Sequence, residues 1–277
     1  MAVMFSALLA SGCGEGVLDP HGPVGNAERI ILYDATTIML AVVVPVILLT
    51  LAFAWWFRAG NRRAQYRPEW EYSGRIEMIV WSIPALVIIF LGGIAWIGSH
   101  ELDPIREIKS DGTPVDIEVV SLDWRWLFIY PSQGIASINR LIVPKGVPIH
   151  FSLTSTSVMN SFFVPELGSQ IYTMPGMTTQ LYLQADRAGT YHGLSAQFSG
   201  EGFSDMRFEL LAVSRDEFDA WVKTTQTLGG GLNIAGLANL AKPSRDSQAV
   251  TYGHVEPGLF EIISSGHPAT MLPGQGR

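Results

Sequence analysis

The sequence is poor in cysteine, in charged residues and in positive charge. Its 277 residues include one cysteine, Cys13, which excludes a disulfide scaffold, a cysteine-rich zinc site, an iron–sulfur cluster and any centre that needs two thiolates. Charged residues make up only 16%, against roughly 25% in soluble globular proteins, and this deficit indicates long apolar segments. With 18 basic and 25 acidic residues the net charge is −7, so no surface for nucleic acid is predicted.

Motifs of hydrolytic, phosphate-binding and zinc enzymes are missing as well. The six histidines lie too far apart in sequence for a zinc motif, and the sequence has no G-x-S-x-G, no phosphate-binding loop and no Cys–His pair. Four methionines are scattered along the second half, so core packing is a better interpretation than binding of soft copper: Met159, Met174, Met177 and Met206. These patterns alone predict no active site.

The N-terminus resembles a bacterial lipoprotein signal. Residues 1–12 form a short apolar run, and Cys13 follows the small residues LASG as in a lipobox. No lysine or arginine precedes Cys13, which departs from the usual cationic start of such a signal. We expect residues 1–12 to be a signal peptide, Cys13 to be acylated and residues 13–34 to be exported. A buried structural cysteine is the alternative.

Two longer uncharged runs predict transmembrane helices at residues 35–57 and 78–99. About 20 residues of helix cross the ~30 Å hydrocarbon layer, so both runs are long enough. Trp55, Trp56 and Trp96 lie near the ends of these runs, where aromatic belts occur. The alternative, two buried helices of a soluble protein, would need neighbours that cover every face.

Charges around the two runs predict their orientation. The connector at residues 58–77 contains five arginines, whereas acidic residues flank the other end of each run: Glu28, Asp34, Glu101 and Asp103. Positively charged loops stay in the cytoplasm. We therefore expect a multi-pass protein of the bacterial inner membrane, with a cytoplasmic connector and with both termini and the main domain on the periplasmic side.

The pattern changes at residues 115–213 to short, β-branched or alternating runs separated by turn residues. So many short strands in about 100 residues predict an antiparallel sandwich or barrel. Residues 214–277 form an extension, in which Ser214 and Glu217 have the spacing of a capping box. Two shorter helices are expected in this extension, at residues 232–241 and 256–264.

The order of these features resembles subunit II of the haem–copper terminal oxidases over nearly the whole chain. Three segments carry the resemblance most specifically: EVVSLDWRWLFIYP (118–131), SVMNSFFVPELGSQIYTMPGM (157–177) and SAQFSGEGFSDM (195–206). The resemblance implies a membrane α-helical hairpin followed by an all-β, cupredoxin-like Greek-key sandwich. In the cytochrome c oxidases of the family, this sandwich carries a binuclear copper centre with histidine and cysteine ligands.

In this sequence the copper positions hold residues of a different chemistry. In chain order they are Asn160, Ser195, Gln197, Ser199, Phe203 and Met206, and only the methionine is retained. Two copper ions need bridging thiolates, because a serine hydroxyl is a hard ligand that stays protonated. We therefore expect no metal here and no electron transfer from cytochrome c. Gln197 also replaces a glutamate that helps to bind magnesium in the family.

Quinol oxidases of the cytochrome bo type lack this copper site, and the chain resembles them closely. The shared segments include VLDPHGPVG (17–25), the N-S-F-F run (160–163) and the aromatic extension (217–263). The resemblance implies a proton-pumping complex that oxidises ubiquinol and reduces oxygen to water. Haems and a copper ion are expected in subunit I, with subunits III and IV, the ubiquinol pool and membrane lipid as further partners. This chain would bind no cofactor and would cap and stabilise subunit I.

The resemblance also assigns roles to three single residues. Glu77, at the cytoplasmic start of the second span, matches a glutamate at the mouth of a proton channel and would pass protons towards subunit I. A boundary carboxylate paired with Arg75 is the alternative. Trp124 matches the electron-transfer tryptophan beside the copper centre. Without copper, we expect Trp124 and Trp126 to be packing or subunit-contact residues.

Two other functions remain open from the sequence. A cytochrome c oxidase subunit would need the missing copper ligands. A stand-alone lipoprotein with a degenerate cupredoxin fold, acting as an assembly factor or scaffold, would need only its lipid and neither the two spans nor Glu77. Copurification with a haem-bearing partner would distinguish an oxidase subunit from a stand-alone scaffold.

Overall fold

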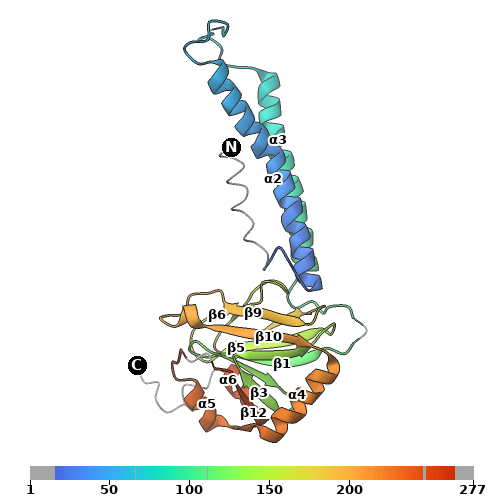
Figure 1. Cartoon of the computed structure of the whole chain (residues 1–277). Helices are drawn as coiled ribbons and strands as arrows, with labels where there is room; N and C mark the ends of the chain where they lie inside the picture. The colour runs from blue at the N-terminus through green and yellow to red at the C-terminus, as the bar shows by residue number, and fades with distance from the viewer. Residues whose placement is uncertain (1–15, 66, 111, 246–247, 266–277) are drawn as a thin grey trace, which may run out of the picture. The chain divides into compact units, whose positions relative to one another are not determined.

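A computed structural model describes residues 16–65, 67–110, 112–245 and 248–265 (Figure 1). The chain forms two compact units. One comprises Met1–Glu28 and Asp103–Arg277, and the other comprises Arg29–Leu102. The boundary between the units falls after Glu28, within the first long helix.

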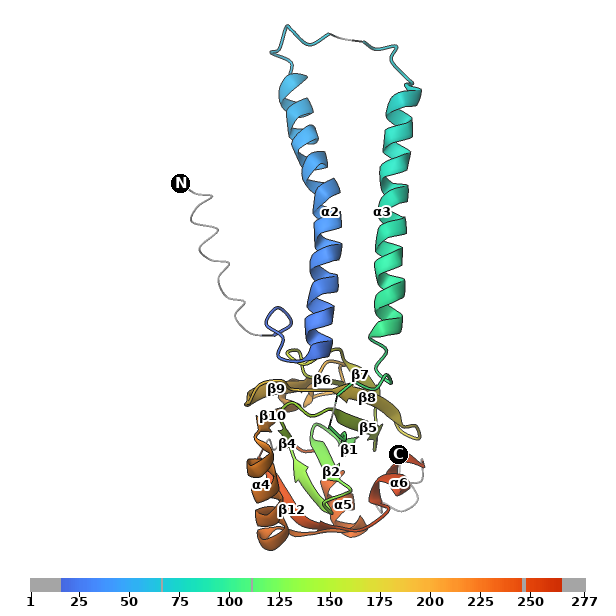
Figure 2. The ribbon, with the colours of Figure 1, turned by 90° about the vertical axis from the view of Figure 1, so that its right-hand side faces the viewer.

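Two long helices, α2 (Pro23–Trp56) and α3 (Gly74–Glu101), are long and apolar enough to cross a membrane (Figure 2). None of the most apolar window of either helix is buried within the chain, whereas a core helix of a soluble protein is mostly buried. Helix α2 begins at Pro23 rather than at residue 35, because proline is favoured at the first helical position and the polar residues that follow continue the helix. These helices form the predicted hairpin.

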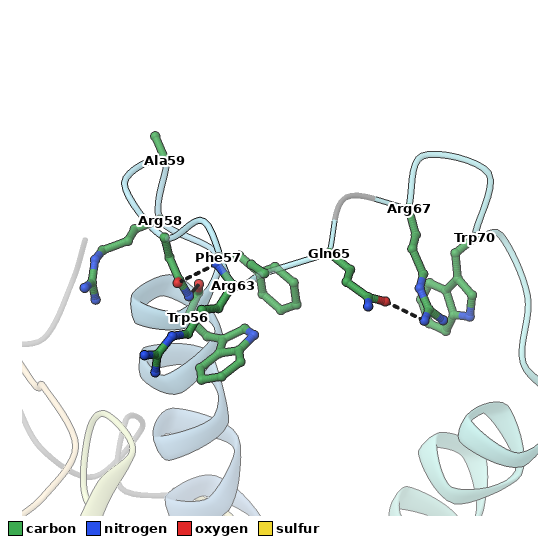
Figure 3. Close-up of a pocket in the computed structure, with 10 residues that line it drawn as sticks. Trp56, Phe57, Arg58, Ala59, Arg63, Gln65, Arg67 and Trp70 are labelled. Carbon is green, nitrogen blue, oxygen red and sulfur yellow. Dashed lines mark hydrogen bonds between the residues drawn. The ribbon is translucent and has the colours of Figure 1, made fainter.

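The helices of the hairpin approach closely at Gly98 of α3. A Cβ atom added at Gly98 would lie 2.8 Å from Cδ1 of Ile31 on α2, so a larger residue there would require the Ile31 side chain to shift. At the other end the connector continues as tight turns (Figure 3). The amide N–H of Asn61 donates to the carbonyl of Arg58 at 2.9 Å, and Nδ2 of Asn61 donates to the carbonyl of Trp56 at 2.6 Å.

The β-domain is a sandwich of a seven-stranded and a five-stranded sheet. In spatial order, the larger sheet contains β11 (Gly230–Leu232), β12 (Val250–Val255), β3 (Ile135–Ile138), β2 (Trp126–Tyr130), β1 (Val115–Ser121), β5 (Ile149–Ser155) and β8 (Thr179–Leu183). The smaller sheet contains β4 (Arg140–Pro144), β10 (Arg207–Val213), β9 (Gly189–Ser195), β6 (Asn160–Phe163) and β7 (Ile171–Thr173). The predicted cupredoxin-like Greek-key sandwich is confirmed.

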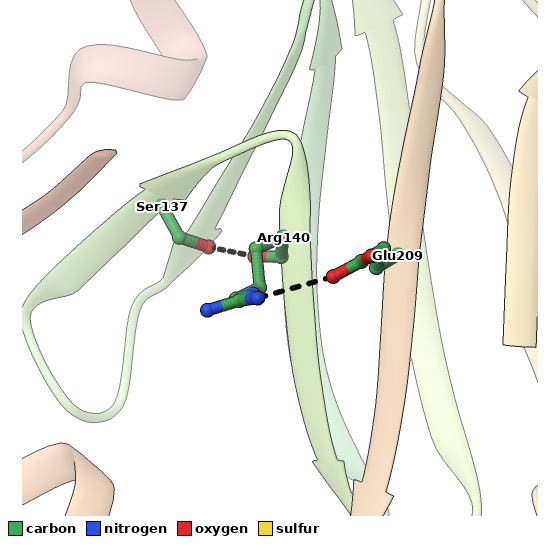
Figure 4. Close-up of polar contacts among 3 residues, drawn as sticks. All are labelled: Ser137, Arg140 and Glu209. Atoms are coloured by element: carbon green, nitrogen blue, oxygen red, sulfur yellow. Dashed lines mark hydrogen bonds and ion pairs between the residues drawn. The ribbon is translucent and has the colours of Figure 1, made fainter. Parts of the chain in front are cut away.

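The expectation of a purely antiparallel sandwich is wrong, because three strand pairs are parallel. These pairs are β1 with β5, β4 with β10, and β11 with β12. Each joins strands that are distant in sequence, which local patterns do not reveal. In the β4–β10 pair Arg140 lies opposite Glu209, and their side chains form an ion pair at 3.1 Å (Figure 4). The carbonyl of Arg140 also accepts a hydrogen bond from Ser137 Oγ.

Strand β2 is buried on both faces, and this explains why its WLFIY sequence does not alternate. Trp126 and Phe128 pack in the core between the sheets, where the ring of Trp126 lies 5.5 Å from that of Phe162. Leu127 and Ile129 face the opposite way, into a second apolar cluster supplied by the C-terminal extension. The extension is therefore part of the folded domain.

The C-terminal extension contains α4 (Arg215–Leu228), α5 (Ile234–Leu240) and α6 (Leu259–Ser264), together with β11 and β12. Ser214 and Glu217 form the predicted capping box at the start of α4. The two short helices occur at the predicted places. The sequence patterns missed the short strands β11 and β12. Strand β11 pairs with β12, and β12 pairs with β3.

Candidate functional site

The fold brings together, at one end of the sandwich, the positions that the resemblance matches to copper ligands. Asn160 begins β6 and Ser195 ends the adjacent strand β9. The loop that follows β9 carries Gln197 and Ser199, passes through a short 3₁₀ helix, η1 (Phe203–Asp205), and returns into β10. Residues up to 46 positions apart in sequence therefore share one site, as the resemblance implies.

A hydrogen-bonded pair of hydroxyl and amide groups occupies the centre of this site. Ser195 Oγ lies 3.1 Å from Asn160 Oδ1 and 3.3 Å from the carbonyl oxygen of Gln197, both of which can accept its proton. Ser195 Oγ also accepts from the amide N–H of Ser161 at 3.4 Å. Asn160 is 1% exposed and Ser195 is 2% exposed, so these contacts satisfy polar atoms that water cannot reach.

Met206, which the resemblance matches to a copper ligand, packs as an apolar side chain of the core. It is 1% exposed, and its amide N–H donates to the carbonyl of Phe203 at 3.2 Å. The prediction of core packing is wrong for Met159 and Met177, which are 38% and 47% exposed. Both residues lie in loops at this end of the sandwich rather than on its strands.

Trp124 contacts the loop that follows β9, which carries positions that the resemblance matches to copper ligands. Its indole Nε1 donates to the carbonyl of Ser199 at 3.0 Å, and a Cβ atom added at Gly202 would lie 2.3 Å from Cδ2 of the indole. The backbone of Trp124 has a positive φ of 69°, which turns its side chain towards this loop. Trp126, by contrast, is fully buried in the core. Of the two expected roles, the position of Trp126 fits packing.

The donor set at this site does not fit a binuclear copper centre. It offers hydroxyls, amides, a phenyl ring and one thioether, whereas soft copper needs thiolate or imidazole ligands. Ser199 Oγ is buried and has no hydrogen-bond partner among the described residues. Among the described residues, no three His, Cys, Asp or Glu side chains form a group that could hold a metal ion.

Glu77 lies in the first turn of α3, with Ser73 at the N-cap, and it is exposed. A carboxylate is favoured there by the positive end of the helix dipole. No ion pair joins Glu77 to Arg75 in the described part of the chain, so the structure offers no support for the paired alternative. Cys13 lies outside the described residues.

The N-terminal segment just before α2 docks on the sandwich, and sequence reasoning missed this contact. The amide N–H of His21 donates to the carbonyl of Glu166 at 2.7 Å, and the carbonyl of His21 accepts from Asp186 at 2.8 Å. A Cβ atom at Gly22 would lie 2.2 Å from the carbonyl oxygen of Gln184. The two glycines of VLDPHGPVG, Gly22 and Gly25, are the sequence signal that points to so close an approach.

The β-domain matches a known family model. Residues 93–213 match the model described as "Cytochrome C oxidase subunit II, periplasmic domain". The fold and the match together define the class, a cupredoxin-like subunit II of the terminal oxidases. Within that class, this site lacks the thiolates and imidazoles that copper requires.

Relatives assign the chain more closely within that class. It is 49% identical over 257 residues to cytochrome bo(3) ubiquinol oxidase subunit 2 of Pseudomonas aeruginosa, covering 93% of this chain and 78% of the relative. It is 49% identical over 260 residues to ubiquinol oxidase subunit 2 of Acetobacter aceti (93% and 84%) and 36% identical over 239 residues to quinol oxidase subunit 2 of Bacillus cereus (85% and 82%). The chain belongs to the family of quinol oxidase subunit 2, and the resemblance seen in the sequence is confirmed.

Proposed function

We propose that this chain is the non-redox subunit II of a proton-pumping terminal quinol oxidase, which oxidises ubiquinol and reduces oxygen to water. One observation carries the proposal. In a chain 49% identical to ubiquinol oxidase subunit 2, the positions that the resemblance matches to copper ligands include a hydrogen-bonded Asn160 and Ser195, whose amide and hydroxyl groups are unsuited to a binuclear copper centre. Electrons therefore need another route into the complex, and a quinol dissolved in the membrane supplies one.

The redox centres of the complex are proposed to lie in the partner subunit I, with haems and a copper ion there and with subunits III and IV completing the assembly. The chemistry of this chain supports that division, because its one thiol is Cys13 and its former copper site holds hydroxyls and amides. The structural part of this chain is then to cap and stabilise subunit I. Glu77, exposed at the start of α3, is proposed to collect protons for subunit I.

The chain is an inner-membrane protein with two candidate membrane-spanning helices. Its proposed orientation places the arginine-rich connector in the cytoplasm and the sandwich in the periplasm, with Cys13 acylated. The orientation is tested with Ala59→Cys, whose thiol a membrane-impermeant maleimide should label in inverted vesicles and not in spheroplasts. Labelling in spheroplasts would indicate the opposite orientation.

Mass spectrometry of the mature N-terminus tests the lipid on Cys13.

Oxygen uptake by the complex, captured through a C-terminal tag on this chain, tests the function. Ubiquinol-1 and reduced cytochrome c are offered in separate runs. Uptake with ubiquinol-1 alone is expected. Uptake with cytochrome c would mean that electrons enter by a route that the Asn160–Ser195 site excludes. A captured chain without haem and without uptake would instead support the scaffold function, which relatives spanning 93% of the chain do not favour.

A further inference from the structure

The connector between α2 and α3 forms an open cavity lined by arginine, aromatic and amide side chains. We propose that this cavity binds the phosphate headgroup of an anionic phospholipid in the cytoplasmic leaflet. Its volume of about 880 Å³ lies within the range of small-ligand sites. The proposal rests on the proposed function in one respect, because it needs the connector to lie at the cytoplasmic surface of the membrane.

Positive charge is concentrated in the connector, and no described acidic side chain forms an ion pair with it. Residues 58–67 contain four arginines and no acidic residue, and all four arginines are exposed. Glu69 and Glu71 follow closely in sequence, yet the described residues show no ion pair to any of the four. Positive charge concentrated next to a membrane-spanning helix attracts anionic lipid headgroups.

Two of the arginines that line the cavity are held in place by local contacts. Arg58 Nη1 donates to the carbonyl of Trp55 at 3.1 Å, and its guanidinium lies 4.9 Å from the centroid of the Trp55 ring. Arg67 Nη2 donates to Gln65 Oε1 at 2.8 Å. Each contact uses one of the five N–H donors of a guanidinium, so the others can donate to phosphate oxygens. Because these contacts already restrain Arg58 and Arg67, binding of a phosphate group would cost less side-chain entropy than binding to unrestrained arginines.

The turn after α2 brings Arg63 to the same cavity. The side chain of Asn61 accepts from the amide N–H of Arg63 at 3.1 Å while it donates to the end of α2. Figure 3 shows the side chains of Arg58, Arg63 and Arg67 directed from the connector back towards the level of the helix ends. At a bilayer, this direction carries guanidinium groups to the depth of the lipid phosphates rather than out into the cytoplasm.

A membrane lipid fits this cavity better than a soluble phosphate compound or an acidic protein surface. The cavity includes Trp56, the last residue of α2, and Trp70 of the connector, which are 45% and 59% exposed. Indole rings are enriched at the headgroup level of membranes, and guanidinium binds phosphate through two parallel hydrogen bonds. A soluble anion would not account for the exposed indoles or for the direction of the arginines.

The test uses the purified oxidase complex, stripped of lipid in detergent and titrated separately with phosphatidylglycerol, phosphatidylcholine and inorganic phosphate. Native mass spectrometry counts the bound molecules. The triple variant Arg58→Gln/Arg63→Gln/Arg67→Gln is expected to bind phosphatidylglycerol about 100-fold more weakly, since each of the three arginines near an anionic lipid contributes roughly a factor of five. Phosphatidylcholine binding should not change.

Two matched variants separate the cavity from general charge effects. Arg207→Gln/Lys223→Gln/Lys242→Gln removes the same charge from the sandwich and should leave phosphatidylglycerol binding unchanged. Replacing Arg58, Arg63 and Arg67 with lysine keeps the charge and loses the two-bond geometry, so part of the affinity for phosphatidylglycerol should remain.

Three results would overturn the proposal. One is equal affinity for phosphatidylglycerol in the connector triple variant and the parent complex. Another is inorganic phosphate bound as tightly as the lipid, which indicates a site for soluble anions. The third is loss of a partner subunit without a change in lipid affinity, which indicates that the arginines bind protein. A complex that fails to oxidise ubiquinol-1 would contradict the proposed function alone, because the lipid titration does not depend on turnover.

Discussion

Among single residues, Ser195 and Asn160 show how buried polar side chains are stabilised by contacts with each other and with the backbone. Both are buried, and a buried polar atom without a partner costs about 1–3 kcal/mol. The Ser195 hydroxyl avoids that cost because it donates to Asn160 and accepts from the amide of Ser161. The site is therefore expected to stabilise the fold rather than to take part in turnover.

Substitution of Ser195 by alanine tests this role. Ser195→Ala leaves Asn160 Oδ1 and the amide of Ser161 without this partner, so it should reduce the free energy of unfolding by about 1–3 kcal/mol. Thermal unfolding of the purified complex, followed by tryptophan fluorescence, measures the loss. Ser204→Ala, at an exposed position of η1, is the control. Unchanged stability with slower ubiquinol oxidation per complex would contradict the structural role.

Glu77 is the residue for which we predict an effect on turnover. Glu77→Gln should slow oxygen uptake with ubiquinol-1 severalfold while haem content and subunit composition stay unchanged, because an amide cannot take up and release the proton. Glu77→Asp should retain part of the activity. Glu71→Gln, also exposed near the start of α3, is the matched control. A full rate in Glu77→Gln would leave Glu77 as a boundary residue only.

Glu118 on β1 makes the stability of the sandwich depend on pH. Burial, followed by the charges of Glu261 and Asp116, raises the pKa of Glu118 to about 7 from the ordinary value of 4.5. The folded chain then holds this proton more tightly than the unfolded chain. Its free energy of unfolding therefore falls as pH rises from 4.5 to about 7 and stays lower above that range.

Glu118→Gln should remove this dependence. The variant is expected to be more stable than the parent by about 1 kcal/mol at pH 8, a figure reduced for solvent screening because Glu118 is partly exposed, and to differ little at pH 4. Thermal unfolding of the complex at both pH values measures the difference. Asp205→Asn, at an exposed site, should show no such pattern. A gain of equal size at both pH values would argue against the titration of Glu118.

Among the elements, the segment before α2 connects the N-terminal part of the chain to the sandwich. Gly22→Ala places a Cβ atom 2.2 Å from the carbonyl oxygen of Gln184, so the segment must move. Overpacking of this kind costs about 1–3 kcal/mol. We expect a lower unfolding temperature of the complex and faster proteolysis at this segment. Gly231→Ala, where an added Cβ meets nothing within 4 Å, is the control. Equal stability of the two variants would contradict the docking.

For the chain as a whole, the C-terminal extension completes the core rather than decorating it. A chain ending at Val213 would uncover Leu127 and Ile129 of β2, whose burial each contributes about 1.5–3 kcal/mol. We expect this chain not to accumulate in membranes and not to copurify with haem. Immunoblots and haem spectra of tagged membranes measure both. A chain ending at Ser265 keeps α6 and should assemble normally.

Features with a strong local signal could be predicted from sequence alone. An apolar run of about 20 residues specifies a membrane helix by length, and Ser214 with Glu217 specifies a helix start by spacing. The absence of copper at Ser195 and Ser199, which the resemblance matches to thiolate positions, rests on ligand chemistry and stays a prediction. The helix inferences hold because each depends on neighbouring residues.

Features that join distant residues needed the folded chain. No local pattern shows that β4 pairs with β10 in parallel, that Leu127 faces the extension, or that His21 docks beside Glu166. The contact of Asn160 with Ser195 and the presence of three arginines around one cavity also depend on the folded chain. Each is a choice among many long-range pairings, and the packing energy of the complete chain selects one of them.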